Sequence, residues 1–322
     1  MKKCFYCLIW LLSIFYVVGC ARSPAYKQDQ NYYKGDNQAY YGGAGGKSPT
    51  HRIESMGQPK KRVMVLNFWN DTPIKQGDIG LFAADELKRR IHQTQRLIIP
   101  ADLKTEFGTQ DFVHGDKVKV AQLIREGRRM GVAVLVIGRI TKIVFRQRGD
   151  EVGLLRQKQS LAAVDVEIKL FDVSGGREIM AAGKSGESSS NTMVAFESNN
   201  LESKEYRAEL TKLAVRNAVG MLVPDVIKAV EKMSWSGHVA KIVGQKVYVN
   251  AGKVSGLISG DILKVLSPGD DIYDPATGAY LGRSEGQLKG TLEVVDFIGP
   301  DGASTEIHTG GGFQEGDVVQ LY

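Results

Sequence analysis

Apolar and polar positions change their spacing along the chain, and each spacing predicts a different element. Residues 62–70 (RVMVLNFWN) and 132–137 are near-continuous apolar runs, a pattern typical of buried strands. Between them, Asp78 can cap a helix. The apolar residues of that helix recur at the 3.6-residue spacing: Ile79, Phe82, Ala83, Leu87 and Ile91. We also expect a short strand at 96–99 and a second helix at 116–130.

Strict alternation replaces the apolar runs further along the chain. Within 162–173, Val164, Val166, Ile168 and Leu170 alternate with mostly charged residues, so one face of this strand is expected to be buried. Neighbouring strands at 143–148 and 178–184 complete an antiparallel set, and Gly175-Gly176 supplies the turn before the last one.

A long helix is expected at 203–232. Its predicted inward residues fall on one connected face: Leu210, Leu213, Ala214, Asn217, Ala218 and Met221. Pro224 has no amide hydrogen and its ring clashes with the preceding turn, so the helix should kink or split in two there.

From residue 237 onward, glycine is frequent and the apolar runs are short. Six strands are expected, at 239–243, 246–250, 262–266, 290–297, 304–308 and 318–321. Short strands separated by glycine turns predict a small barrel or sandwich. The predicted fold class is therefore α+β: an α/β sandwich with a mixed sheet over 61–233, then a small all-β, barrel-like domain over 234–322.

The amino-terminal residues carry an export pattern. Lys2 and Lys3 precede an apolar run that ends in Val17-Val18-Gly19-Cys20, and a charged start, a short apolar stretch and a small residue compose a signal peptide. The run is shorter than the ~20 residues that span a bilayer. A plain signal peptide, or a short anchor helix with an incidental cysteine, is the alternative interpretation.

The last four residues of this pattern resemble a bacterial lipobox. The resemblance implies a signal peptide over 1–19, cleavage between Gly19 and Cys20, and lipidation of Cys20. Ala21, rather than aspartate, follows the cysteine. By analogy with enterobacterial sorting, this implies an outer-membrane anchor facing the periplasm.

Residues 20–60 are expected to form a flexible tether. They contain almost no aliphatic side chains, so they cannot bury enough apolar area to offset the entropy lost on ordering. About 40 flexible residues have a root-mean-square reach of roughly 35 Å. The tyrosines of this segment could stack on sugars or on a partner, and a solvated linker is the alternative.

Charge and cysteine content exclude several functional classes. Lys and Arg number 42 against 36 Asp and Glu, a formal net charge of +6, which is too small to indicate nucleic-acid binding. The cysteines are Cys4, Cys7 and Cys20. Signal cleavage and lipidation would leave none for a disulfide, a zinc site or a thiol nucleophile.

No motif for catalysis, a cofactor or a metal is expected. Gly46-Lys47-Ser48 is not a phosphate-binding loop, because Tyr41 stands where its first glycine would be. The histidines show no paired ligand spacing: His51, His92, His114, His238 and His308. Three acids lie in SPGDDIYDPATG: Asp270, Asp271 and Asp274. The calcium-loop pattern is absent there, and Asp-Pro followed by Thr-Gly favours a hairpin turn.

Two stretches are similar to known families. Residues 62–232 resemble the curli-secretion-channel (CsgG-like) periplasmic domain and the TolB amino-terminal domain, through VMVLNFWN, VAVLVIGRI and AAVDVEIKLFDVSGGREIMAA. Residues 237–322 resemble the carboxy-terminal domain of flagellar assembly protein T, through GHVAKIVGQKVYVNAGKVSGLISGD, DPATGAYLG and GFQEGDVVQL.

The resemblances imply a non-enzymatic, structural component of a multi-subunit envelope machine, either a secretion system or a flagellar-type ring. The implied partners are outer-membrane lipid through Cys20 and neighbouring subunits, as a homo-oligomer or in a ring. One alternative is an export pore of the curli type, although its two candidate insertion segments, 147–159 and 186–204, have no lipid-facing apolar stripe. Another alternative is a peptidoglycan- or glycan-binding adaptor.

Overall fold

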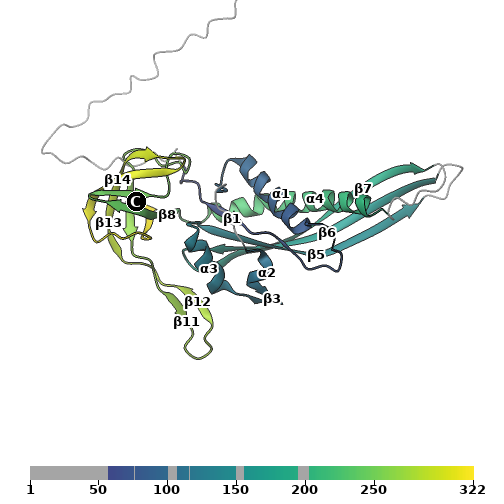
Figure 1. The fold of residues 1–322 in the computed structure, drawn as a ribbon, viewed down its shortest axis with the longest axis horizontal. Helices are drawn as coiled ribbons and strands as arrows, with labels where there is room; N and C mark the ends of the chain where they lie inside the picture. Colours follow the sequence, from purple (N-terminus) through teal and green to yellow (C-terminus); the bar gives the residue numbers. More distant parts are fainter. Residues whose placement is uncertain (1–56, 76, 101–106, 116, 150–155, 195–202) are drawn as a thin grey trace, which may run out of the picture. The chain divides into compact units, whose positions relative to one another are not determined.

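The computed structural model describes residues 57–75, 77–100, 107–115, 117–149, 156–194 and 203–322. Helices and a mixed sheet are followed by a small closed barrel (Figure 1), which confirms the predicted α+β fold class. The signal at 1–19 and almost all of the tether at 20–60 lie outside the described residues. The proposed domain boundaries at 61–233 and 234–322 stay predictions.

The mixed sheet has the strand order β1-β5-β6-β7, with β2 also paired to β5. Its strands are β1 (Val63–Val65), β2 (Trp69–Asn70), β5 (Val134–Gly149), β6 (Arg156–Asp172) and β7 (Arg177–Val194). β1 and β2 run parallel to β5, whereas β5, β6 and β7 are mutually antiparallel. β5 is one strand of 16 residues, so the separate strands expected at 132–137 and 143–148 are in fact continuous.

Helices cover both faces of the sheet (Figure 1). On one face lie α1 (Ile79–Thr94) and α4 (Lys204–Glu231). On the other lie α2 (Thr109–Phe112), α3 (Val120–Arg129) and a hairpin of β3 (Val113–His114) and β4 (Lys117–Val118). Consecutive residues of β1 alternate between the two cores, since Val63 and Val65 join the α1 and α4 side while Met64 joins the other.

The α1 prediction is confirmed in detail. The Asp78 carboxylate accepts a hydrogen bond of 3.2 Å from the Leu81 amide and caps the helix. The buried apolar residues of α1 include four of the predicted set: Ile79, Ala83, Leu87 and Ile91. This face packs against α4 and the sheet.

The inward face of α4 differs from the prediction. Leu210, Ala214 and Ala218 are buried as expected, but Leu213 and Met221 are 41% and 46% exposed and Asn217 is exposed. The helix as a whole packs against both the sheet and α1. Its buried stripe also includes Thr211, Val215, Val219, Leu222, Val226 and Val230. A helix with two neighbours buries a wider stripe than one apolar face predicts.

One of the two outcomes expected at Pro224 does not occur. α4 continues through Pro224 to Glu231, so the helix does not split in two, and the side chains packed around it outweigh the lost hydrogen bond. The kink stays a prediction. The strand expected at 96–99 is reduced to a single bridge between Ile98 and Arg62. Pro100 follows immediately and offers no amide hydrogen to extend the pairing.

The carboxy-terminal strands close into a barrel in the order β10-β13-β14-β9-β8-β15. Their bounds are β8 (Ser236–Val243), β9 (Lys246–Val249), β10 (Ile262–Leu266), β13 (Leu288–Ile298), β14 (Gly302–Gly310) and β15 (Val318–Leu321). β11 (Asp271–Tyr273) and β12 (Tyr280–Arg283) form a separate hairpin. The barrel core shares no residue with the two cores of the sheet.

Among the described residues, no helix combines the length and the hydropathy that a bilayer span requires.

Candidate functional site

The predicted lipidation site lies outside the described residues. Gly19 and Cys20 both precede residue 57, where the description of the fold begins. Most of the two segments considered for membrane insertion, 147–159 and 186–204, is also undescribed at the level of side chains. Lipidation and the pore alternative therefore stay predictions.

The aspartates of SPGDDIYDPATG lie in and around a hairpin turn, as predicted. The Asp274 carboxylate accepts backbone hydrogen bonds from Ala276 at 2.8 Å and Thr277 at 3.3 Å, and these bonds lower the pKa of Asp274. Asp271 instead binds Arg128. No group of three potential metal ligands occurs among the described side chains.

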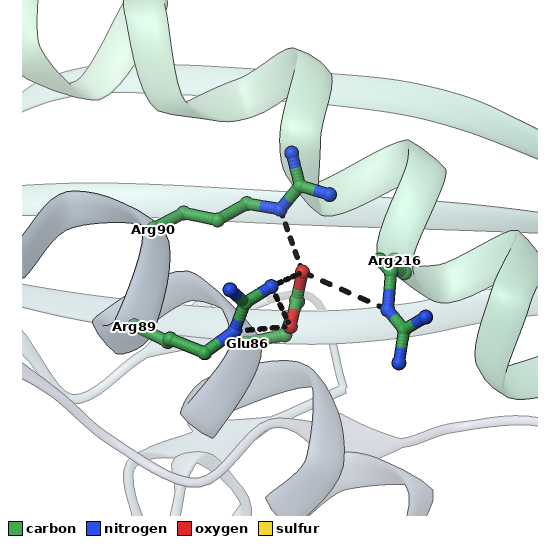
Figure 2. Close-up of polar contacts among 4 residues, drawn as sticks. All are labelled: Glu86, Arg89, Arg90 and Arg216. Atoms are coloured by element: carbon green, nitrogen blue, oxygen red, sulfur yellow. Dashed lines mark hydrogen bonds and ion pairs between the residues drawn. The ribbon is translucent and has the colours of Figure 1, made fainter. Parts of the chain in front are cut away.

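A buried carboxylate with three arginines joins α1 to α4. Glu86 is 5% exposed. Arg89 donates from Nε and Nη2 at 2.6–3.0 Å, and Arg90 donates from Nε at 2.6 Å. Arg216 of α4 adds an ion pair at 3.9 Å. Figure 2 shows the three guanidinium groups converging on the carboxylate from two helices.

The electrostatics of this cluster favour the charged form of Glu86. Burial raises the pKa of Glu86, but the hydrogen bonds and charges of Arg89 and Arg90 outweigh burial, and the pKa is lowered overall. Sequence reasoning missed the cluster. Glutamate followed by arginine at i+3 and i+4 in one helix is its only local signal, and Arg216 lies far along the chain.

The other candidate feature is the open edge of β7. This strand has 18 residues and pairs with β6 alone among the described strands. Among the described residues, one bond to this edge is found: the Glu187 carbonyl accepts a 2.7 Å hydrogen bond from Asn217. A long open edge strand is a ready template for strand addition.

A groove runs between the first half of β7 and the second half of α4. Its volume is about 510 Å³. The floor is apolar: Ile179, Met180, Ala182, Ala229 and Met233. Three cations and one carboxylate lie around it, namely Arg177, Lys228, Lys232 and Asp225, and Asp225 is paired with Lys184 at 3.2 Å. The groove and the β7 edge together offer backbone pairing, an apolar floor and a basic rim.

The opposite edge of the sheet has a different structure. Ile98 donates to the Lys61 carbonyl at 3.0 Å and accepts from the Val63 amide at 2.8 Å. Ile98 and Ile99 are only partly buried. One edge of the sheet is therefore the long strand β7, and the other is a single bridge at Ile98.

Comparisons with known proteins give only distant similarity. No family model matches this sequence, and no curated protein matches it. A solved hypothetical protein from Chlamydia trachomatis is 16% identical over 53% of this chain and 98% of its own, with a TM-score of 0.35. A lipoprotein from Neisseria meningitidis is 15% identical over 54% and 99%, with a TM-score of 0.27.

A third solved structure is the PelC dodecamer from Paraburkholderia phytofirmans. It is 14% identical over 52% of this chain and 88% of its own, with a TM-score of 0.28. These values are too low to transfer a function, so function is argued from the residues of this chain alone.

Proposed function

We propose that this protein is a lipid-anchored, periplasm-facing subunit of the outer membrane that assembles with copies of itself into a larger envelope structure. It acts as a structural component without enzymatic activity. Machines of the secretion-system or flagellar-ring kind use such subunits. The anchoring half of the proposal is supported by Val17-Val18-Gly19-Cys20, and the assembly half by the open edge of β7.

The charge of the groove favours head-to-tail assembly. Antiparallel pairing of β7 with the β7 of a second copy, in the register that overlaps their first halves, would bring two basic rims together, each with Arg177, Lys228 and Lys232, and like charges that face one another repel. Pairing β7 with the 96–99 segment of a neighbour would keep the two basic rims apart, and it would meet Arg96 and Arg62 instead. Unlike surfaces that meet head to tail generate a ring when the rotation closes.

Lipidation would assist this assembly by confining the subunits to one surface. Confinement raises the effective concentration of neighbours without any new contact. Stable anchoring requires at least two acyl chains, since a single chain binds membranes reversibly. The lipid anchor therefore contributes to assembly by concentrating the subunits, and the β7 edge contributes by binding a neighbour, so the two can be tested separately.

The first prediction concerns the anchor. The Cys20→Ala variant should leave the outer-membrane fraction, because it has no thiol to receive lipid. Membrane fractionation with immunoblotting measures this, and mass spectrometry of the wild-type amino terminus gives the acyl mass. The Cys7→Ala variant is the matched control and should fractionate like the wild type. Retention of the Cys20→Ala variant in the outer membrane, with assembly intact, would contradict the anchoring role.

The second prediction concerns the β7 edge. Cysteines occur only at Cys4, Cys7 and Cys20, so introduced thiols can report contacts between copies. An Ala181→Cys, Ile99→Cys double variant treated in cells with a bis-maleimide should give a ladder of dimers, trimers and higher species. Each single variant should stay monomeric, as should a control with Ile99→Cys and Gln93→Cys. Electrophoresis under denaturing conditions measures the ladder.

The outcomes of this experiment distinguish pairing of β7 with β7 from pairing of β7 with the Ile98 edge. Dimers from the Ala181→Cys single variant alone would show that β7 pairs with β7, and head-to-tail assembly would be wrong. If all variants stayed monomeric, the β7 edge would not be an assembly surface. Neither result depends on where the protein fractionates, so the assembly and anchoring halves are tested separately.

A further inference from the structure

A second cavity lies where the end of the sheet meets the barrel strands. Its volume is about 410 Å³, within the range of small-ligand pockets. The lining comes from the end of α3, the turn between β6 and β7, the segment 232–234, β8 and the loop 283–286. We call this cavity the junction crevice.

Cations outnumber carboxylates in the junction crevice. Arg128, Arg177, Lys232 and Arg283 line it, against Asp172 and Glu285. Asp172 already accepts hydrogen bonds from the amide and hydroxyl of Ser174, at 2.9 and 2.7 Å. Asp271 lies outside the lining but pairs with both Arg128 and Arg283, at 2.9 and 3.7 Å. Four cations therefore stand against three carboxylates, an excess of one positive charge.

Two of the arginines are held in place. Arg128 Nη2 donates to both carboxylate oxygens of Asp271, at 3.0 and 2.9 Å. Arg283 Nε donates to the Gly269 carbonyl at 2.6 Å, and its side chain is only 8% exposed. Fixed guanidinium groups are pre-organised donors for planar or tetrahedral oxyanions.

Buried polar atoms without partners lie at the same place. Neither Arg128 Nε nor His238 Nδ1 has a hydrogen-bond partner among the described residues. Burial lowers the pKa of His238, and the charges of Arg283 and Arg62 lower it further, so the ring is neutral at pH 7 and can donate one hydrogen bond. Buried polar groups in folded proteins are normally satisfied, and both of these residues line the crevice.

We infer that the junction crevice binds a small ligand through a carboxylate or phosphate group. The net positive charge of the crevice attracts an anion, and the fixed guanidinium groups orient it. The unpaired nitrogens of Arg128 and His238 add hydrogen-bonding capacity. Such an anion could be free phosphate or a carboxylate of a cell-wall sugar. The inference does not depend on the lipid anchor. The crevice shares Arg177, Lys232 and Met233 with the groove beside β7, whereas Ser234 lines only the crevice of the two, so Ser234→Glu is the variant that separates the two surfaces.

Calorimetric titration of the detergent-solubilised full-length protein at low salt tests the inference. The probes are inorganic phosphate and N-acetylmuramic acid, which carries a carboxylate, with N-acetylglucosamine as the uncharged sugar control. We expect saturable binding of at least one charged probe and none of N-acetylglucosamine. Tighter binding of N-acetylmuramic acid than of phosphate would identify the cell-wall sugar as the source, and the reverse would identify phosphate.

Two variants locate the binding. Ser234→Glu adds a carboxylate to the crevice lining and should weaken binding about tenfold or more. Lys232→Gln removes one cation and should weaken it by roughly threefold to tenfold. The matched controls are Gln245→Glu and Lys253→Gln, which make the same charge changes at exposed positions elsewhere and should bind within about twofold of the wild type.

Either of two results would overturn the inference. One is that neither charged probe binds the wild type. The other is that binding occurs but Ser234→Glu and Lys232→Gln behave like their controls, because the anion would then be adventitious. Circular dichroism of each variant confirms that the fold is intact.

Discussion

At the residue scale, Glu86 is a buried charge between α1 and α4. Its carboxylate is nearly fully buried yet stays charged, because Arg89, Arg90 and Arg216 surround it. Hydrogen bonds to a charged group contribute more than neutral ones, and removing one partner leaves the others buried or unpaired. The hydrogen bonds of the cluster lie within α1, and the 3.9 Å ion pair with Arg216 reaches α4, beside the apolar core that the two helices share (Figure 2).

The third prediction follows from this cluster. The Glu86→Gln variant should lose about 1–3 kcal/mol of unfolding free energy at pH 7, measured by urea denaturation. Asp85→Asn is the matched control, since Asp85 is 60% exposed and pairs only with Lys88. The control should lose less than about 0.5 kcal/mol. Equal losses in the two variants would show that the buried cluster contributes no more than a surface pair.

The same cluster predicts a pH dependence. The pKa of Glu86 is lower in the folded protein than its ordinary value, so its contribution is fully present above the ordinary pKa. The contribution is lost as the pH falls through the folded pKa. The difference in unfolding free energy between the wild type and the E86Q variant should therefore shrink between pH 7 and pH 3. A difference that stays constant over this range would mean that the carboxylate charge is not involved.

At the element scale, α4 lies directly on β7 because of one glycine. A Cβ atom at Gly186 would overlap the Ala214 carbonyl and the Ala218 amide of α4. The neighbouring buried residue of the strand, Ser188, is also small. Because Gly186 and Ser188 are small, the backbone of α4 can lie close to the backbone of β7.

The fourth prediction concerns this contact. Gly186→Ala should destabilise the protein by about 1–3 kcal/mol, because the helix backbone has to move. Gly183→Ala is the matched control on the same strand, where the nearest atom to a new Cβ is Glu167 Cγ at 3.4 Å, an ordinary contact. Thermal unfolding measures both. A Gly186→Ala variant as stable as the control would show that α4 does not pack tightly on β7.

The α4 helix explains why the sequence predicted α1 well but did not predict the full length of β7. The α1 helix was predictable because its cap and its apolar spacing are local. Residues 185–190 (SGESSS) have no apolar alternation, yet they continue β7. The reason is that the next element, α4, folds back over Gly186 and Ser188, which are small and buried. Likewise, the inward face of α4 depends on two neighbours that the helix sequence does not reveal.

At the scale of the whole molecule, the barrel and the sheet have separate cores and are joined by specific polar contacts. Arg128 binds Asp271, and Arg62 donates to the Asn250 carbonyl at 3.2 Å. The fold class could be predicted because glycine-rich strands differ from apolar runs in the sequence. The Glu86 cluster, the β7 edge and the junction crevice could not, since each unites residues from distant segments.

Under the proposed head-to-tail assembly, the unlike edges of the sheet have a genetic consequence. A copy with a blocked β7 edge and an intact Ile98 edge could still join a growing chain of subunits, but it could accept no successor. Such a copy would terminate growth at low abundance and behave as a dominant-negative allele. Co-expressed with the wild type at a one-to-ten ratio, it should shorten the cross-linked species out of proportion to its amount, whereas a misfolded copy would be diluted without effect.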